Sequence, residues 1–430
     1  MTLRKCLNPK YIIEFIIEYV TMKSKTLDNP YSWPVIALSL AIANMTFGFG
    51  IFFPYLPLFA ESLGANLGLQ IGLLTTGFMA ARTLTALPFG SVSDQLGRKN
   101  SIVVGLFVYG IITILFYFSQ DWTHVLLLRT IQGITAGLIW PASRAMIYDL
   151  VGPGARGRAI SVLNISAGAG MAFGPIFGAF LLSYIQSDMT LTPVDSFRIP
   201  FIFAGGFGLF SSLFAFVTLS SDFIPSKRTR FFKMIDNVDP KFVRTFYSSL
   251  LMNVSHGFAF GMFRPVLVLY IYQVLGYSLL ETASISAISF SLGSLSNSLS
   301  QIVGGRLADY RNRKYVITIA VIISQIATFS ILFATDVIQL YIAIIVRFAA
   351  IGIFIPSLAS IEGDIIPANQ RGQLSGLVEG FRGIGSAIGP LLCLAFYDYV
   401  WTGSPFVLSP LLFIICLIVY FVNYKEPLEK

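Results

Sequence analysis

Charged side chains that interrupt long apolar runs are the residues of this chain best placed to do chemistry. Arg82, Arg129, Arg264 and Arg347 supply cations, and Glu379 supplies an acid. A charge within an apolar run is costly in hydrocarbon, so it normally faces a partner or a wet cavity. A guanidinium binds anions and a carboxyl can carry a proton. These positions are therefore candidates for substrate binding and proton coupling, and the excess of arginine over acid hints at an anionic substrate.

Several of these positions also have a simpler explanation. Arg129 and Gln132 are three residues apart in one span and are further candidates to line the cavity. Arg129 could instead extend to the membrane surface, although we favour the cavity. Arg382 lies three residues after Glu379, so the two can form an ion pair within one helix. His256 can titrate near neutral pH, but a lone histidine is more often a packing residue. The sequence leaves both explanations open.

The composition indicates a membrane protein. Of 430 residues, 55% are hydrophobic and 12% are charged, against about 25% charged in a soluble domain. Mean hydropathy is +0.75. The basic balance does not point to nucleic acid, because the position of the charge matters more than its sum. Three scattered cysteines lack the spacing of a metal site, and no phosphate-binding loop is present. We expect neither an enzyme nor a bound cofactor or metal.

Apolar stretches of about 20 residues predict an all-α membrane protein with twelve spanning helices. Lys and Arg gather in the segments on the side of both termini, whereas the loops on the other side hold one, Arg198. This asymmetry predicts cytoplasmic termini in a multi-pass protein of the plasma membrane. The predicted spans are 33–56, 70–92, 100–118, 123–147, 159–185, 198–219, 243–272, 281–304, 315–334, 338–361, 373–398 and 404–423.

These spans divide the chain into parts. Residues 1–32 form a cytoplasmic segment, either an amphipathic helix on the membrane surface or a disordered tail. Residues 33–219 and 243–424 each form a bundle of six helices. The basic stretch 220–242 reads as the cytoplasmic linker between them, and 425–430 as a tail.

An internal repeat supports this division. The loop that contains Gly90, Asp94, Arg98 and Lys99 returns 215 residues later. Because the matching residues are glycine and charged types in an apolar chain, we infer a duplication. The repeated set consists of Gly90, Asp94, Gly97, Arg98 and Lys99 in the first copy and of Gly305, Asp309, Arg313 and Lys314 in the second. In the second copy, Asn312 stands at the position of Gly97. Asparagine tolerates a left-handed backbone, so the turn can persist.

This loop resembles that of the major facilitator superfamily, whose pattern is Gly-x-x-x-Asp-x-x-Gly-Arg-Lys/Arg. The resemblance implies two pseudo-symmetric six-helix bundles that rock about a central cavity. It also implies that the loop is a conformational latch, in which Asp94 faces the amino-terminal dipole of a helix beginning near Gln373. Arg98 and Lys99 would then pair with carboxylates or lipid phosphates. The alternative is that these two cations only anchor the topology.

A second motif resembles the antiporter signature of the same family. It consists of Gly170, Gly174, Pro175 and Gly178. Within the family it favours export by proton antiport, but Gly385, Gly389 and Pro390 repeat it in the second half, so a shared structural hinge is an equal alternative.

The first span departs from the drug-antiporter pattern because it has no acidic residue. Coupling would then use another titratable residue: Glu379, His256, Glu362 or Asp364.

The sequence thus predicts a secondary transporter of the drug:proton antiporter-like branch that works by alternating access. The expected activity is proton-coupled efflux of small amphipathic or drug-like molecules. Uptake or uniport of a small organic anion or sugar is the alternative, and a non-transporting receptor or scaffold is the alternative of another class. Expected partners are a small-molecule substrate, protons and membrane lipids, with no nucleic acid and a monomeric state.

Overall fold

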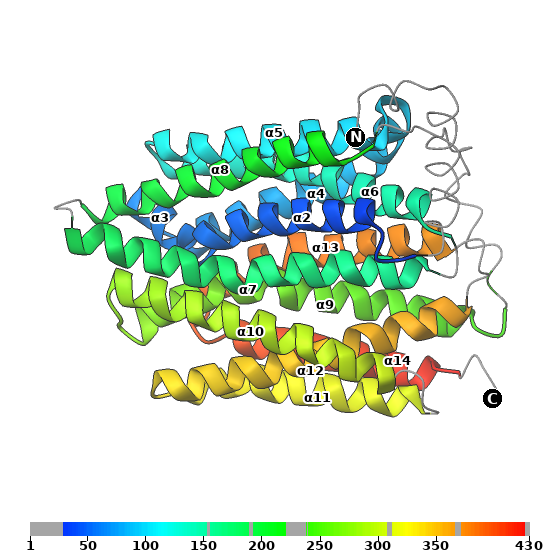
Figure 1. The fold of residues 1–430 in the computed structure, drawn as a ribbon. Helices are drawn as coiled ribbons and strands as arrows, with labels where there is room; N and C mark the ends of the chain where they lie inside the picture. Colours follow the sequence, from blue (N-terminus) through cyan, green and yellow to red (C-terminus); the bar gives the residue numbers. More distant parts are fainter. Residues whose placement is uncertain are drawn as a thin grey trace, which may run out of the picture.

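The computed structural model describes residues 29–152, 155–188, 192–220, 238, 240–307, 312–365 and 371–425, which are almost entirely helical (Figure 1). The long helices of the first half are α2 (Trp33–Phe52), α4 (Gly68–Leu96), α5 (Arg98–Leu115), α6 (Trp122–Leu150), α7 (Arg156–Asp188) and α8 (Pro193–Thr218). Those of the second half are α9 (Val243–Leu269), α10 (Leu279–Leu307), α11 (Arg313–Ser330), α12 (Val337–Ile365), α13 (Arg371–Tyr399) and α14 (Pro405–Asn423).

Short elements extend several of these helices. After α2 the chain continues through a 3-10 turn, η1 (Phe53–Tyr55), into α3 (Leu56–Ser62). A π-helical turn, η4 (Tyr270–Val274), follows α9, and the 3-10 turns η2 (Phe116–Phe118) and η5 (Ile331–Phe333) follow α5 and α11. The predicted amphipathic segment, most of the linker and the tail lie outside the described residues.

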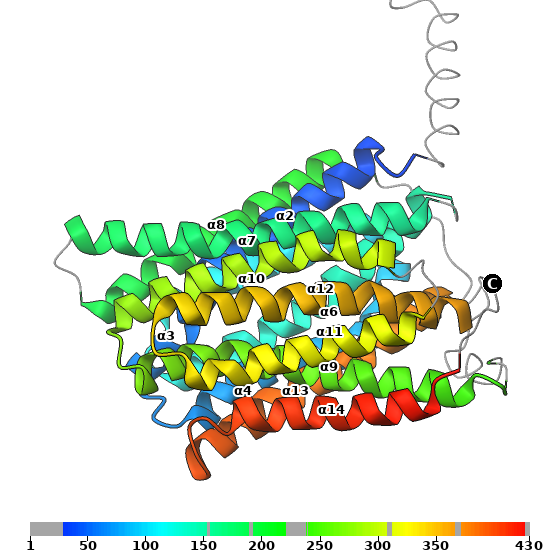
Figure 2. The same cartoon turned by 90° about the horizontal axis from the view of Figure 1, so that it is seen from below.

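Helices are the expected solution for this composition, because hydrocarbon offers no partner to backbone polar groups and a helix pairs them internally. Among the described residues, ten candidate spans are long and apolar enough to cross a membrane. The helices outside this set are α4 and α10, which were predicted as spans. α4 packs on α13 and α10 packs on α7 (Figure 2), so each can carry polar residues toward protein.

The two halves repeat one packing scheme. In the first half, α2 packs on α7 and α8, α4 on α6, and α5 on α8. In the second half, α9 packs on α13 and α14, α10 on α12, and α11 on α14. The result is two six-helix bundles with equivalent internal contacts, as the duplication predicts.

Local geometry at the repeated loop is alike in φ and different in ψ. Gly97 has a φ of 88° and a ψ of 144°, whereas Asn312 has a φ of 75° and a ψ of 34°. The asparagine therefore takes the left-handed backbone that was predicted for it, but the turn differs from that of the first copy. Beyond the turn, Arg98 contacts Asp149 at 3.2 Å, and in the second copy Arg313 contacts Asp364 at 2.6 Å.

The glycine motif of α7 and its repeat in α13 are both close-packing surfaces. A Cβ at Gly170 or Gly174 would collide with a backbone carbonyl oxygen of α2, and one at Gly389 would collide with a carbonyl oxygen of α9. Small residues of this kind let helix backbones approach closely. The carbonyl oxygens that exclude a side chain belong to Ala43 for Gly170, Phe47 for Gly174, Ile51 for Gly178, Val254 for Gly385 and Phe258 for Gly389.

The two ends of the bundles can be told apart by the terminal helices of the described chain. α2 begins and α14 ends at the same end of the bundles, on the right of Figure 1, and we call this end the terminal face. The other end is the opposite face. α4 and α13 run antiparallel, so the end of each lies near the beginning of the other.

Candidate functional site: a charged network between the bundles

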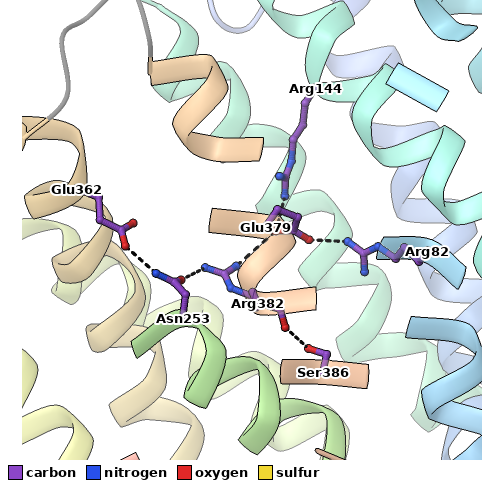
Figure 3. A network of polar contacts seen from close by, with 7 residues as sticks. All are labelled: Arg82, Arg144, Asn253, Glu362, Glu379, Arg382 and Ser386. Atoms are coloured by element: carbon purple, nitrogen blue, oxygen red, sulfur yellow. Dashed lines mark hydrogen bonds and ion pairs between the residues drawn. The ribbon is translucent and has the colours of Figure 1, made fainter. Parts of the chain in front are cut away.

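Glu379 of α13 is the centre of a group of charges where the two bundles meet (Figure 3). Its Oε1 accepts a hydrogen bond of 2.8 Å from Arg82 of α4. Its Oε2 lies 3.7 Å from a nitrogen of Arg144 on α6 and 3.7 Å from one of Arg382 on α13. Arg82 and Arg144 belong to the first bundle, so Glu379 ties the bundles together. The predicted pairing of Glu379 with Arg382 exists, but the contact across the interface is shorter.

The network continues into the second bundle through an amide. Arg382 donates to Oδ1 of Asn253 at 3.1 Å, and Nδ2 of Asn253 donates to Oε1 of Glu362 at 2.6 Å (Figure 3). The Glu362 side chain is buried, with 3% of its surface exposed. One chain of polar contacts thus links five helices, namely α4, α6, α13, α9 and α12.

The centre of this network is not sealed from solvent. Exposed fractions of the side chains are 24% for Arg82, 28% for Arg144, 30% for Arg382 and 31% for Glu379. Three guanidiniums surround one carboxylate, so the cluster keeps a positive charge even when Glu362 is ionised. A charged group part-way along a spanning helix needs partners or water, and this cluster has charged partners and partly exposed side chains.

Arg129 and Gln132 lie inside the first bundle. Arg129 is 1% exposed, its guanidinium lies 4.2 Å from the ring centre of Phe78, and it donates to Gln132 at 2.6 Å. Gln132 in turn donates to the hydroxyl of Thr113 at 2.8 Å. Arg129 therefore neither extends to the membrane surface nor opens to a cavity here; it is paired within a packed interior.

Arg347 takes the same place in the second bundle that Gln132 takes in the first. It donates to the hydroxyl of Thr328 at 3.0 Å, the repeat position of Thr113, and to the carbonyl oxygen of Ala259 at 3.1 Å. Its guanidinium lies 3.7 Å from the ring centre of Phe263. The duplication has kept the site of a polar contact and changed its charge.

Arg264 and His256 have aromatic surroundings on α9. Arg264 is half-buried, and its guanidinium faces the rings of Phe53 at 4.8 Å and Phe260 at 4.9 Å. His256 is buried, with its ring 5.6 Å from that of Phe354. Among the described residues, Nδ1 of His256 has no hydrogen-bond partner, so packing accounts for its surroundings.

Further polar contacts join the bundles at the opposite face. The carboxylate of Asp398, at the end of α13, accepts from the backbone N–H groups of Gly68 at 2.9 Å and Leu69 at 2.7 Å, at the beginning of α4. Gln273 contacts Glu61 at 3.4 Å and accepts from the Tyr397 hydroxyl at 3.0 Å. Asp398 thus gives α4 a cap from the other bundle.

Sequence reasoning missed Arg144 and Asp398. Both are charges near the end of a predicted span, and this position was their signal. The predicted latch stays a prediction, because Asp309, the surroundings of Gly90 and the side chain of Asp94 lie outside the described part of the chain. Of its other members, Lys99 and Lys314 rest on aromatic rings of the last helix of their own bundle, Phe216 and Phe421 respectively. Gly305 has open space around its Cα.

Comparison with known families identifies the fold. The family profile described as Major Facilitator Superfamily matches residues 38–252 and again residues 249–430. The chain belongs to the Major Facilitator Superfamily. It is therefore a multi-pass membrane protein and a secondary transporter of this superfamily (MFS), not an enzyme. The double match agrees with the two equivalent bundles.

Relatives in sequence are distant but cover most of the chain. The quinolone resistance protein NorA of Staphylococcus aureus (strain COL) is 23% identical over 370 residues, which is 85% of this chain and 90% of the relative. An uncharacterized MFS-type transporter of Methanocaldococcus jannaschii is 27% identical over 350 residues, covering 80% of this chain and 85% of the relative. At this distance the family is shared, while the substrate is a separate question.

Solved structures share the fold. A crystal structure of the human organic anion transporter MFSD10 superposes with a TM-score of 0.67 at 19% identity, covering 90% of this chain and 98% of that one. A bacterial homolog of the human lysosomal transporter Spinster, in an inward-facing and occupied conformation, gives a TM-score of 0.74 at 16% identity, with 93% and 98% covered.

Proposed function

We propose that this MFS transporter exports small amphipathic organic molecules and that molecules with a negative charge are its preferred class. The observation that carries the proposal is the charge between the helices. Three arginines surround Glu379, and Arg264 adds a further cation toward the opposite face. Removing a cation from bulk water is costly unless a counter-charge is near, so such an interior favours an anionic ligand.

Alternating access requires contacts that close one face and can break. In this conformation Asp398 and Gln273 join the bundles at the opposite face. We take the terminal face as the cytoplasmic side of the plasma membrane, as the basic loops predict. The opposite face would then open outward when these contacts separate. A few hydrogen bonds, each worth about 0.5–3 kcal/mol, suit an equilibrium between two populated states.

The names of similar proteins support a substrate of this kind. The Staphylococcus relative is a quinolone resistance protein, and one of the similar structures is an organic anion transporter. Neither name defines the substrate of this chain, but together they favour an amphipathic molecule over a simple ion.

A transport assay with matched probes tests the proposal. Purified protein in proteoliposomes is given naphthalene-2-sulfonate, the cation (2-naphthyl)trimethylammonium, or the neutral 2-naphthyl glucoside, each in counterflow with empty liposomes as the control. We expect the sulfonate to move about tenfold faster than the cation. Equal rates for the two charges would reject the anionic class, and preferred glucoside transport would favour the sugar alternative.

Proton coupling is a second element of the proposed function, and Glu362 is the observation that favours it. This buried carboxyl contacts the neutral amide of Asn253, and that amide leads to Arg382 and so to Glu379. A carboxyl in this position can exchange a proton without losing its hydrogen-bond partner.

Replacing the carboxyl separates coupling from transport. We expect Glu362→Gln to retain counterflow of the sulfonate but to lose accumulation driven by a pH gradient. Wild-type movement that ignores an imposed proton gradient would exclude antiport, and the anionic substrate class could still stand.

A further inference from the structure

Arg129, Arg264 and Arg347 each pack on aromatic rings, and they differ in what their N–H groups bind. Arg129 donates to Gln132, and Arg347 donates to the Thr328 hydroxyl and the Ala259 carbonyl. These two guanidiniums therefore have acceptors inside the protein.

Arg264 differs from them, because within the described part of the chain it has no hydrogen bond and no ion pair at all. The buried Nε atoms of Arg264 and Arg129 both have no partner there, but Arg129 has its bond to Gln132 through another nitrogen. A guanidinium carries five N–H donors in a planar fork that matches a carboxylate or sulfonate. Its Nε donor is buried without an acceptor, which is unfavourable, so the site is suited to an acceptor from outside the chain.

The rings around Arg264 define the rest of the ligand. Phe53, Phe260 and Phe290 have their ring centres 4.8, 4.9 and 5.8 Å from its guanidinium carbon. Aromatic side chains bury large apolar area and favour flat ligands through offset or edge contacts. The charge and the rings together fit a flat apolar molecule with one acidic group.

We propose that Arg264 anchors the negative group of the transported molecule, with Phe53, Phe260 and Phe290 holding its apolar part. This inference rests on the proposed function and names its binding site. The network around Glu379 is the weaker candidate, because its three arginines already share an internal counter-charge.

The site also lies where the bundles separate. Phe53 belongs to the first bundle, whereas Arg264 and Phe290 belong to the second. Beside Arg264 lies a cavity of about 10 Å³, lined also by Thr75 and Pro265, which has room for about one water molecule. A larger ligand therefore needs Phe53 to move away, so rocking of the bundles would open and close the site.

Binding to the purified full-length protein tests the site. Thermal stabilisation by naphthalene-2-sulfonate and by 2-naphthyl glucoside gives an apparent Kd for an anionic and a neutral probe. We expect Arg264→Gln to weaken sulfonate binding about tenfold or more and glucoside binding less than about twofold. Arg264→Lys should fall between wild type and glutamine, because the charge remains but the fork does not. Arg129→Gln is the matched control, and its ratio of the two Kd values should equal that of wild type.

A measurement on the wild-type protein covers the case in which the variants do not fold. Phenylglyoxal modifies accessible arginines, and mass spectrometry reads the modification at each one. We expect the sulfonate to protect Arg264, with Arg82 as the internal comparison. Protection of Arg82 without protection of Arg264, or an Arg264→Gln protein that binds the sulfonate as wild type does, would overturn the site while the anionic class stands. A wild-type protein with no preference for the sulfonate would instead reject the proposed function.

Discussion

The bundles meet along two interfaces that the duplication makes equivalent, and these interfaces differ in charge. Where α4 packs on α13, Arg82 pairs with Glu379. Where α10 packs on α7, the residues at the corresponding positions are Asn297 and Asn164. Asn297 donates to the carbonyl of Phe348 within its own bundle, and Asn164 is exposed. The fold is duplicated, but the charged connection is present once.

The contrast suggests different mechanical roles. At the α4/α13 interface the ion pair is accompanied by a hydrogen bond of 2.7 Å from Thr76 to the carbonyl of Ala387. Small residues occur at both interfaces: Gly168 lies beside the hydroxyl of Ser298 at the α7/α10 interface, and Gly72 and Gly383 lie against the facing helix at the other. Small residues let helices approach closely, whereas directional bonds hold a position, so the directional bonds are what distinguish the two interfaces. We infer that rocking pivots on the charged interface and slides on the other.

Removing Glu379 should have the largest effect. Loss of one partner of a buried ion pair costs about 3–5 kcal/mol, and the partial exposure of this cluster reduces that to about 1–2 kcal/mol. We expect Glu379→Gln to lower transport at least tenfold, because three arginines then repel one another at the pivot. Counterflow in proteoliposomes measures the loss.

The matched control is the repeat position on the other interface. Asn164→Ala removes an exposed side chain from α7 and should leave counterflow within about twofold of wild type, as most surface substitutions do. Equal losses in the two variants would show that the interfaces do the same work and that the charge is incidental.

Glycine substitutions test where the halves should behave alike. Gly174→Ala and Gly389→Ala each place a Cβ against a carbonyl oxygen of the facing helix, from Phe47 and Phe258 respectively. Overpacking of this kind costs about 1–3 kcal/mol, so both should lower the melting temperature by similar amounts. If Gly174→Ala stopped transport without loss of stability while Gly389→Ala did not, the motif of α7 would be an antiport element rather than a shared packing surface.

Some of this organisation could be predicted from sequence, because it follows from local rules. Apolar length predicts helices, and the repeat predicts two bundles. The turn at Asn312 follows from the backbone preference of asparagine. The left-handed geometry at that position shows how far a local rule can reach.

The partners of the charges could not be predicted in this way. Arg82 and Glu379 are separated by 297 residues, and only the packing of α4 on α13 brings them together. Arg129 looks like a cavity residue in sequence, yet Phe78 and Gln132 enclose it. Rotation of a helix about its axis decides such contacts, and nearly uniform apolar sequences give little indication of that rotation.

Removing the cap at the opposite face should have a moderate effect on the balance of states. Asp398→Asn replaces the carboxylate that accepts from the backbone of Gly68 and Leu69. Losing a cap and its interaction with the helix dipole costs about 1 kcal/mol, a factor of about five in population. We expect the state with the opposite face open to gain by that factor.

Spin labels can measure this shift. Gln120→Cys and Thr335→Cys, exposed repeat positions in loops of the opposite face, report the separation of the bundles in a Cys6→Ser background. Cys393 and Cys416 are buried and can stay. A distance distribution that does not change in Asp398→Asn would mean that the contact is a passive cap and that the face is held by other residues.

The smallest effect is expected at a cap remote from both interfaces. Asp121 precedes α6 as its N-cap and accepts from the backbone of Thr123 at 2.8 Å and of His124 at 3.0 Å. At the repeat position, Asp336 precedes α12 and accepts similarly from Gln339 at 2.9 Å. Hydrogen bonds hold the pKa of Asp121 below its usual range, and the bond from the Thr123 hydroxyl contributes more than those from the backbone N–H groups. A lowered folded-state pKa stabilises the fold above the unfolded pKa, and this contribution disappears as pH falls through the folded value. Asp121→Ala should therefore lower the melting temperature by about 1–2 °C at pH 7 and by progressively less as the pH falls below the usual range of an aspartate, without altering transport. If the loss of melting temperature were the same in acid, the neutral carboxyl would cap the helix as well as the charged one does. The difference in charge between equivalent parts of the two bundles would then matter only at the α4/α13 interface.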